Sequence, residues 1–474
     1  MIFDNFEKMT TTITESAEKI RDVIRYIKRF KNAVVVIYID DRIIDSPLFS
    51  SHISDIALMH EAGLNVLIVP GAKRRIDDVL SEAGISWKQK DGLRIADESS
   101  MPLVKMAAFD VSNKVMTALS GHGITAVIGN WVRSRSKGVI NGFDYETCGE
   151  IEKISVDAVH TVLDDGFIPI FPCIGWSVNG KPYNISSIEL ASKTAIDLKA
   201  EKLFFLAPDA TLDAKNFTLS QDFPLSPEGN IPAMNLEEVD EFLKINSDSK
   251  NPLLTLLSIS VGACKNGVSR VHILNGSIDG VIPCEIFSGL GSGTMIYKND
   301  YGGIRAMKQD DVPRVLGIMR PFIERGILLP RTEAQLSENA ENYIVYELDG
   351  GIRACAALIC YDENGNVVSI AENNAALPDA ARTKIAQTEI TQSEIAAVAV
   401  DETYSHMGIG PKMVSYLIEK ARSVGSKDVF ILTTQTGDWF EKLGFKIDSV
   451  ENLPEARRKI WSPQRASKVF RLKL

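Results

Sequence analysis

The sequence predicts an α/β protein of at least two domains, and three observations support this class. Apolar β-rich runs alternate with amphipathic helices up to about residue 297, which is typical of a mainly parallel sheet sandwiched by helices. The alternation stops at a glycine-rich stretch, Gly289 to Gly303. Beyond it, a strand, a glycine loop and a helix follow one another from Glu394 to Ser423. A chain of 474 residues is also too long for one core, so two or three domains are expected.

The composition limits the possible functions. The net charge of −10 provides no basic surplus to neutralise phosphates, which argues against non-specific nucleic-acid binding. The N-terminus lacks a basic stretch followed by an apolar run, and no apolar run approaches membrane-spanning length, so a cytoplasmic location is expected. The six cysteines form no CxxC pair and no Cys/His pairing, so we expect neither a disulfide framework nor a metal site.

The first predicted element is an amphipathic helix over residues 12–30. Its apolar side chains recur at helical spacing, at Ile13, Ala17, Ile20, Ile24 and Ile27. The helix precedes the first core strand, so it is either an arm that packs on another subunit or a helix that caps its own domain.

The next elements alternate between strand and helix. β-rich runs predict strands at 33–39, 65–69, 126–128, 168–171, 203–206 and 270–274, and apolar periodicity predicts helices at 50–62, 101–119, 156–165, 188–199 and 253–265. Gly63 is a plausible C-cap of the first of these helices.

The last third of the chain has a different order of elements. It predicts a strand from Ile304, a helix at 312–325, strands at 343–348, 352–360 and 394–400, a helix at 411–423 and a strand at 429–434. Residues 362–393 are polar and rich in Ala and Asn, and we interpret them as a long hairpin or a partly mobile loop.

The most informative motif runs from Glu394 to Gly410. Glu394 opens an apolar strand, and the loop Gly408-Ile409-Gly410 leads into a helix. A glycine loop before a helix presents backbone N–H groups to an anion, and a carboxylate one strand-length away could act as a general base. The motif therefore suggests a phosphate-bearing cofactor held beside a proton acceptor.

This order of elements resembles the GCN5-related acetyltransferases (GNAT), which have an α+β fold. The stretch Phe440 to Phe445, an F-x-x-x-G-F helix end after a strand, supports the resemblance, whereas Gly408-x-Gly410 alone would fit a structural turn equally well. The resemblance implies that the loop residues Ser405, His406, Met407, Gly408, Ile409, Gly410 and Lys412 bind the pyrophosphate of acetyl-CoA, and that Val398 and Val400 support its pantetheine arm. Ser405 stands where the family has Arg or Gln, a missing contact for which Lys412 could compensate.

The resemblance also implies the chemistry of the site. Acetyl-CoA is expected as the co-substrate, with no metal. Glu394 is expected to be the general base that deprotonates an amine, and Thr433 stands where the family places a hydroxyl for the departing thiolate.

The C-terminal segment suggests the acceptor. Leu453-Pro454-Glu455-Ala456-Arg457 and the later Arg465-Ala466-Ser467-Lys468-Val469 resemble the terminal signature of the N-acetylglutamate synthases. That resemblance implies that Arg457, Arg465 and Ser467 bind the carboxylates of L-glutamate, for which the planar guanidinium is well suited. On residue type alone these arginines would be surface charges. The implied reaction gives N-acetyl-L-glutamate and CoA, the first step of arginine biosynthesis.

The first part of the chain resembles the amino acid kinase fold. The segments 69–73, 90–97, 184–187 and 285–296 carry this resemblance, and the last of them, together with His272, resembles the arginine-binding end of arginine-sensitive members. It implies an allosteric L-arginine site at His272, Glu285, Gly291 and Gly293.

This kinase-like part is predicted to be inactive as a kinase. Asp40 and Asp41 replace the glycines of the first phosphate loop, and no lysine occurs between Asn251 and Cys264. Without cations the charge on a transferring phosphoryl group would go uncompensated. The predicted organisation is therefore an arm at 1–30, a kinase-like regulatory domain at 31–297 and an acetyltransferase domain at 298–474. The arm and the kinase-like fold favour a homo-oligomer, with a hexameric ring as one form.

Three alternatives remain open from sequence. The chain could be a bifunctional synthase and acetylglutamate kinase, which Asp40 and Asp41 argue against. It could be a non-catalytic arginine sensor, which the replacement at Ser405 would favour. It could also acetylate an amino acid other than glutamate.

Overall fold

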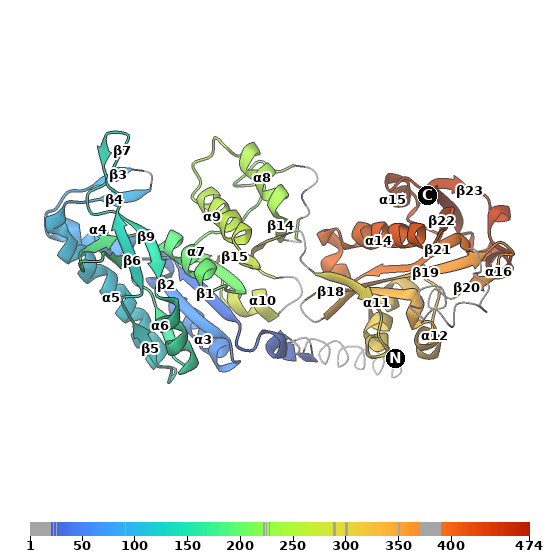
Figure 1. Ribbon diagram of the computed structural model, residues 1–474, viewed down its shortest axis with the longest axis horizontal. Helices are drawn as coiled ribbons and strands as arrows, with labels where there is room; N and C mark the ends of the chain where they lie inside the picture. The colour runs from blue at the N-terminus through green and yellow to red at the C-terminus, as the bar shows by residue number, and fades with distance from the viewer. Residues whose placement is uncertain are drawn as a thin grey trace, which may run out of the picture. The chain divides into compact units, whose positions relative to one another are not determined.

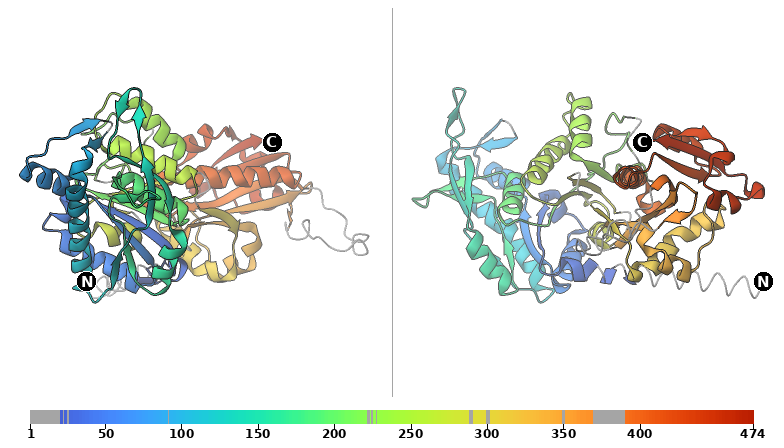
Figure 2. Two further views of the ribbon diagram at one scale, coloured as in Figure 1. Left: turned by 60° about the vertical axis from the view of Figure 1, so that its left-hand side comes forward. Right: turned by 45° about the vertical axis from the view of Figure 1, so that its right-hand side comes forward.

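The computed structural model describes residues 20–21, 23–24, 26–90, 92–220, 223, 225–226, 228–287, 291–298, 302–348, 351–368 and 390–474. The chain divides into two compact units, Met1–Asn299 and Asp300–Leu474. Figure 1 labels the helices and strands of both units, and Figure 2 shows them from two further directions.

The N-terminal unit is built on an eight-stranded, mainly parallel sheet. Its spatial order is β14 (Ala233–Asn235), β16 (Thr294–Tyr297), β15 (Arg270–Asn275), β13 (Lys202–Ala207), β1 (Val34–Ile39), β2 (Asn65–Pro70), β10 (Ile168–Ile170) and β5 (Ala126–Ile128). Every neighbouring pair is parallel except β15 and β16. The central strands are buried on both faces, which is why they appear in the sequence as continuous apolar runs.

Two groups of helices cover this sheet. In the first group α3 (Phe49–Glu61) packs on α5 (Met101–Ser120) and α10 (Val281–Phe287), and in the second α9 (Leu253–Lys265) packs on α7 (Ser187–Asp197) and α8 (Leu236–Ile245). The remaining helices of this unit are α2 (Asp41–Ile44), α4 (Lys73–Glu82) and α6 (Val156–Asp164). The predicted α/β class with a mainly parallel sheet and helices around it is confirmed.

A second, four-stranded sheet was not predicted from sequence. It has the order β12 (Pro182–Asn184), β11 (Ile174–Trp176), β6 (Val132–Ser136) and β9 (Gly149–Ile154). Two small hairpins, β3 (Lys88–Lys90) with β4 (Leu93–Ile95) and β7 (Val139–Ile140) with β8 (Phe143–Asp144), complete the unit. These strands are short and carry many charged residues, so they lack the apolar runs that identify the core strands.

The predicted N-terminal helix lies only partly within the described residues. Residues 20–21, 23–24 and 26–30 are helical. The predicted apolar stripe is exposed at Ile20 and Ile24, whereas Tyr26 and Phe30 are buried. Both of these rings lie about 5 Å from Nζ of Lys202, at 5.1 and 4.8 Å, so this end of the helix packs on its own unit.

The C-terminal unit contains a mainly antiparallel sheet. Its order is β17 (Gly303–Ala306), β18 (Tyr343–Leu348), β19 (Gly351–Asp362), β21 (Ile390–Val400), β22 (Asp428–Thr433), β24 (Lys468–Lys473) and β23 (Lys446–Asp448), and β20 (Val367–Val368) pairs with β19. Only β21 and β22 are parallel.

Helices cover both faces of this sheet (Figure 1). Helix α14 (Ile409–Ser423) packs on the face formed by Ala354, Ala356, Leu358 and Ile395. Helix α11 (Val312–Glu324) and the short α12 (Glu333–Glu338) pack on the opposite face, with Cys355 and Ala357. This alternation along β19 follows the two-residue period of a strand. The short helices α15 (Gly437–Lys442) and α16 (Glu455–Lys459) follow β22 and precede β24.

Several predicted strand ends differ from the structure by one or two residues, and the start of β21 was predicted too late. Strand β21 begins at Ile390, so Glu394 is its fifth residue and not its first. The polar residues before Glu394 were assigned to the 362–393 insert, but Ser393 is fully buried and its Oγ lies 2.7 Å from Oγ of Ser426. Of the insert, residues 369–389 lie outside the described residues.

Two further observations concern the described parts of the chain. None of the helices there combines the length and apolarity needed to cross a membrane. All six cysteines lie in these parts and none forms a disulfide; five are buried and Cys284 is exposed.

Candidate active site

The candidate site centres on a buried carboxylate, Glu394, which is 4% exposed. The hydroxyl of Tyr361 donates to Oε2 at 3.0 Å. Nε of Arg457 lies 3.0 Å from Oε1 and 2.9 Å from Oε2, so both oxygens share one N–H. Burial, and then the nearby Glu394, raise the pKa of Tyr361 far above its usual value. Tyr361 therefore stays neutral and acts as a hydrogen-bond donor.

A pocket opens beside Glu394, and three arginines line it: Arg331, Arg457 and Arg465. Nη2 of Arg465 donates to the carbonyl of Ile327 at 2.6 Å. Burial, and then the neighbouring Arg457, lower the pKa of Arg465. Nε of Arg331 is buried without a hydrogen-bond partner among the described atoms. Because three cations face one carboxylate, the pocket suits a ligand that carries more than one negative charge.

The pocket brings together residues that sequence predicted and one that it missed. Arg457, Arg465 and Ser467 were predicted, and all three line the pocket with Glu394. Arg331 follows α11 in a loop where no periodicity marks it.

Tyr361 was also missed. Its partner lies on a neighbouring strand, and the register of that strand depends on the insert between them. No signal in the sequence alone identifies either Tyr361 or Arg331.

The strands β21 and β22 separate just beyond Glu394. They pair only from Gln392 to Glu394, opposite Asp428 to Phe430. The register between β21 and β19 shifts nearby, and Ala397 adopts a left-handed backbone with φ of 52°. Among the described strands, none pairs with the β22-facing edge of β21 beyond Glu394. The predicted cofactor-supporting residues Val398 and Val400 lie on this stretch.

The glycine loop before α14 has the geometry of an open helix N-terminus. Gly408 is the N-cap with φ of 64°, and a Cβ built on it would meet no atom within 4 Å. A Cβ on Gly410 would lie 3.4 Å from the ring of Trp439. The first turn of a 15-residue helix with this free space in front of it can accept an anion on its backbone N–H groups.

The other predicted loop residues have varied surroundings. Residues Glu402–Met407 form a 3-10 turn, and the side chains of His406 and Met407 lie outside the described part. Ser405 is exposed and its hydroxyl donates to the carbonyl of Glu402 at 2.8 Å. Lys412 is exposed in the first turn of α14, one turn from Gly408.

Thr433, the predicted partner of the thiolate, is engaged in a turn. Its Oγ1 accepts the N–H groups of Gln435 and Thr436 at 3.3 and 3.0 Å, and lies 2.7 Å from Oγ1 of Thr436. With both lone pairs occupied, its hydrogen is directed to Thr436. The adjacent hydroxyl of Thr434 is buried without a partner among the described atoms.

Comparisons with known proteins agree with this geometry. The amino acid kinase family model matches residues 10–275, and the acetyltransferase (GNAT) family model matches residues 319–445. The amino-acid acetyltransferase of Vibrio vulnificus is 31% identical over 459 residues, covering 95% of this chain and 96% of its own. That of Pasteurella multocida is 30% identical over 463 residues, covering 96% and 97%.

The chain belongs to the amino-acid acetyltransferases. It is an amino-acid N-acetyltransferase, with a kinase-like domain fused to a GNAT domain and with acetyl-CoA as its co-substrate.

Two solved structures support the assignment of the chain to the amino-acid acetyltransferases. Both are N-acetylglutamate synthase from Neisseria gonorrhoeae, and each match covers 97% of this chain and 99% of the other. The structure complexed with coenzyme A and L-arginine has a TM-score of 0.72 at 28% identity. The one complexed with coenzyme A and N-acetyl-glutamate has a TM-score of 0.57 at 29% identity.

In the kinase-like unit of this acetyltransferase, a carboxylate stands at a helix N-terminus. Oδ2 of Asp41 accepts the backbone N–H of Arg74, in the first turn of α4, at 2.5 Å. Asp40 forms an ion pair with Arg42 at 2.8 Å. Burial raises the pKa of Asp41. The protein's own carboxylate thus takes up an N–H group of the kind that binds phosphate in other proteins.

The four predicted arginine-site residues come together at β15, α10 and the loop that follows. Nδ1 of His272 lies 2.6 Å from Oε1 of Glu285, and both side chains are buried. Oε2 of Glu285 accepts the N–H groups of Ser292 and Gly293 at 2.6 and 2.9 Å. Gly291 has φ of 66°, and a Cβ there would lie 2.8 Å from that Oε2.

The electrostatics of this pair leave one buried acceptor without a hydrogen-bond partner among the described atoms. Burial lowers the pKa of His272 to about 4, so its ring is neutral at neutral pH. Burial acts to raise the pKa of Glu285, but the hydrogen bonds from His272, Ser292 and Gly293 leave it lowered. With Nδ1–H directed to Glu285, Nε2 carries a lone pair, and it has no partner among the described atoms.

Proposed function

We propose that the chain transfers the acetyl group of acetyl-CoA to the amino group of L-glutamate. The observation that carries this proposal is the pocket in which the buried Glu394 lies beside Arg331, Arg457 and Arg465. An amino acid with two carboxylates would find a cation for each, and a base would stand beside its amine. The N-acetyl-glutamate complex of the gonococcal synthase supports the same acceptor.

In the proposed reaction Glu394 acts first. The amine of glutamate is mostly protonated at neutral pH, and it gives one proton to Glu394, directly or through a water molecule. Its nitrogen then attacks the thioester carbonyl carbon, and the backbone N–H groups from Val398 to Val400 support the oxyanion. The C–S bond breaks, the amine loses its second proton as the amide forms, and the thiolate takes up one proton.

The group that assists the thiolate is one of two hydroxyls. Resemblance assigns Thr433, and its hydrogen is committed to Thr436 unless the turn rearranges. Thr434 has an unused hydroxyl one residue away. Comparison of Thr433→Ala with Thr434→Ala separates them, because the assisting residue alone should lower turnover at unchanged affinity for acetyl-CoA.

The glutamate proposal is tested by a thiol-release assay with acetyl-CoA and a panel of amino acids. We expect glutamate to give the highest kcat/KM, with aspartate next and neutral amino acids far lower. A neutral amino acid as the best substrate would contradict the role of the pocket arginines. No release with any amino acid would favour a non-catalytic arginine sensor.

We also propose that L-arginine regulates the enzyme through His272, Glu285, Gly291 and Gly293, while the kinase-like unit has no kinase activity. The lone pair on Nε2 of His272 and the carboxylate of Glu285 suit a guanidinium, which only donates hydrogen bonds. The carboxylate of Asp41 at the N-terminus of α4 opposes phosphate binding. An assay for ATP-dependent phosphorylation of N-acetylglutamate should show no product; measurable product would instead indicate a bifunctional enzyme.

A further inference from the structure

We propose that the turn from Tyr361 to Val368, here called the hairpin root, positions the base Glu394, and that Oε1 is the oxygen that accepts the proton. The hairpin root ends β19 and carries the short strand β20. It reaches Glu394 in two ways, through Tyr361 directly and through α16, which bears Arg457. The inference rests on the proposed role of Glu394 as the base.

The hydrogen bonds distinguish the two oxygens of Glu394. A carboxylate has about four lone-pair sites in all. Oε2 receives the full hydrogen bond of Tyr361 and a share of the N–H of Arg457, whereas Oε1 receives only the other share. Oε1 therefore has more free lone-pair capacity to accept a proton from the substrate amine. Oε2 is occupied by the hydrogen bond from Tyr361.

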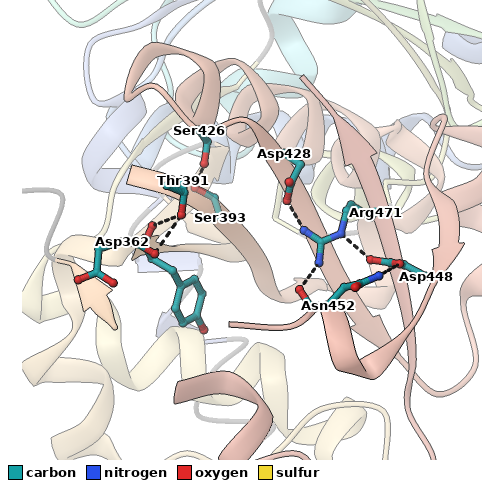
Figure 3. A network of polar contacts seen from close by, with 9 residues as sticks. Asp362, Thr391, Ser393, Ser426, Asp428, Asp448, Asn452 and Arg471 are labelled. Atoms are coloured by element: carbon teal, nitrogen blue, oxygen red, sulfur yellow. Dashed lines mark hydrogen bonds and ion pairs between the residues drawn. The ribbon is translucent and has the colours of Figure 1, made fainter. Parts of the chain in front are cut away.

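The ring of Tyr361 is held in place by packing. Its centroid lies 5.8 Å from that of Phe430, which pairs in register with Glu394 on one side and with Arg471 on the other. The guanidinium of Arg471 lies 5.3 Å from the centroid of Phe430. It forms ion pairs with Asp428 and with Asp448 (Figure 3).

The second contact runs from Gly365 to α16. Gly365 has φ of 75°, and a Cβ built on it would lie 2.6 Å from the backbone nitrogen of Glu455, the first residue of α16. The carbonyl of Gly365 accepts the N–H of Ala456 at 3.2 Å. Arg457 is the next residue, so the hairpin root fixes the helix that presents its guanidinium to Glu394.

The turn itself is held by its first aspartate. Oδ1 of Asp362 accepts the N–H groups of Asn364 and Asn366 at 2.9 and 2.8 Å. Tyr361 and Gly365 therefore belong to one ordered segment. This segment positions both donors to Glu394, the hydroxyl of Tyr361 and, through α16, the guanidinium of Arg457.

The first test replaces Tyr361 by Phe and records the pH profile of kcat/KM. We expect turnover to fall about 10-fold, the usual effect of one hydrogen bond to a charged group, at an unchanged KM for acetyl-CoA. The fall should appear across the pH profile, because the O–H donor that holds Oε2 is lost. A Tyr361→Phe profile that superimposes on that of the parent would overturn the proposal.

The groups around Glu394 do not themselves change charge over such a profile. The charged and titratable groups around it are Tyr361 on β19, Tyr343 on β18, Arg457 on α16 and the pocket arginines. Arginine does not titrate in the range of such an assay, and burial raises the pKa of Tyr343 to about 12.

Tyr343→Phe is the matched control for this test. Tyr343 is also buried, and its hydroxyl has no hydrogen-bond partner among the described atoms. Its loss should leave turnover and the pH profile unchanged. Glu394→Gln, measured in parallel, separates the two levels of the proposal. If Glu394→Gln abolishes activity and Tyr361→Phe has no effect, only the positioning inference fails. If Glu394→Gln retains activity, Glu394 is not the base and the proposed function of this residue fails.

The second test compares Gly365→Ala with Gly425→Ala. Both glycines have a positive φ, 75° and 88°, so both variants bear the strain of a left-handed alanine. Only at Gly365 does the new Cβ meet a backbone atom; at Gly425 nothing lies within 4 Å. We expect both variants to lose thermal stability, Gly365→Ala the more because of its backbone contact. Measured where both remain folded, kcat/KM should fall by about 10-fold for Gly365→Ala alone, because α16 must shift. Equal kcat/KM values in the two variants would contradict the link to α16.

Discussion

The buried carboxylate of Glu394 is the proposed general base, and this role predicts the effect of replacing it. General base catalysis contributes about 10²–10⁴-fold to rate. Glu394→Gln keeps the shape of the side chain and removes the acceptor, so turnover should fall by this factor while the affinity for acetyl-CoA stays nearly unchanged. Steady-state kinetics combined with a thermal shift on acetyl-CoA checks both quantities, and unchanged turnover would refute the assignment.

The buried histidine of the kinase-like unit predicts a dependence of stability on pH. Burial lowers the pKa of His272 to about 4, below the value of about 6.5 in an unfolded chain. Between these values the unfolded chain binds the proton more tightly, so the unfolding free energy falls as the pH is lowered from about 6.5 to 4, by about 3 kcal/mol at most.

His272→Gln should remove this part of the pH dependence. Glu285, whose pKa is lowered, titrates below most of this window. We therefore expect the thermal midpoint of the parent to drop more between pH 7 and pH 5 than that of His272→Gln. Parallel thermal melts at the two pH values make the comparison, and equal drops would show that His272 is not the group responsible.

At the scale of residues, sequence analysis predicted the side chains that belong to a recognisable motif. It missed the side chains whose place in the site depends only on the three-dimensional fold. Glu394, Arg457 and Arg465 stand in recognisable stretches, and the structure brings them to one pocket. Tyr361 and Arg331 reach the same pocket from a strand end and a loop. Their role depends on strand register and on the path of the chain after α11, neither of which leaves a local pattern.

At the scale of elements, helix α14 offers a comparison between its two ends. Gly408 at its start and Gly425 just after its end both have a positive φ, 64° and 88°, and both have free space around a built Cβ. Alanine at either position should lower stability by about 1 kcal/mol, the usual cost of a left-handed alanine. Only Gly408→Ala should raise the KM for acetyl-CoA, because only this end faces the proposed pyrophosphate site.

Kinetics and thermal melts of the two variants together check this prediction. If Gly425→Ala raised the KM for acetyl-CoA as much as Gly408→Ala does, the effect would come from loss of helix stability and not from the loop.

The elements themselves were predictable where apolar residues predominate. The strands 126–128 and 343–348 and the helix 253–265 agree with the structure at both ends, and most of their residues are apolar. The start of β21 and the sheet of β6, β9, β11 and β12 were missed. At the start of β21 the buried hydroxyl of Ser393 is satisfied by Ser426, and such a contact cannot be read from composition. The strands of the second sheet are short and lack the long apolar runs of the core strands.

At the scale of the whole molecule, the proposed regulation links a site in one unit to catalysis in the other. Glu285→Gln removes the charge that would pair with a guanidinium, so calorimetry should show no arginine heat. Acetyl transfer measured without arginine should keep its parental kcat and KM, since Glu285 and Glu394 belong to different units. Retained arginine binding would place the effector site elsewhere, and the sign of the effect on rate would be read from the parent enzyme.

The distribution of cysteines has a practical consequence for measuring this regulation. Burial raises the pKa of the thiols of Cys148 and Cys173 to about 11 and of Cys264 and Cys355 to about 12, and it also raises that of Cys360. Such thiols react slowly with maleimide dyes, which leaves the exposed Cys284 as the position that labels first. Cys284 adjoins Glu285, so a fluorophore attached there would report effector binding as a change in emission, in the native sequence and without an engineered cysteine.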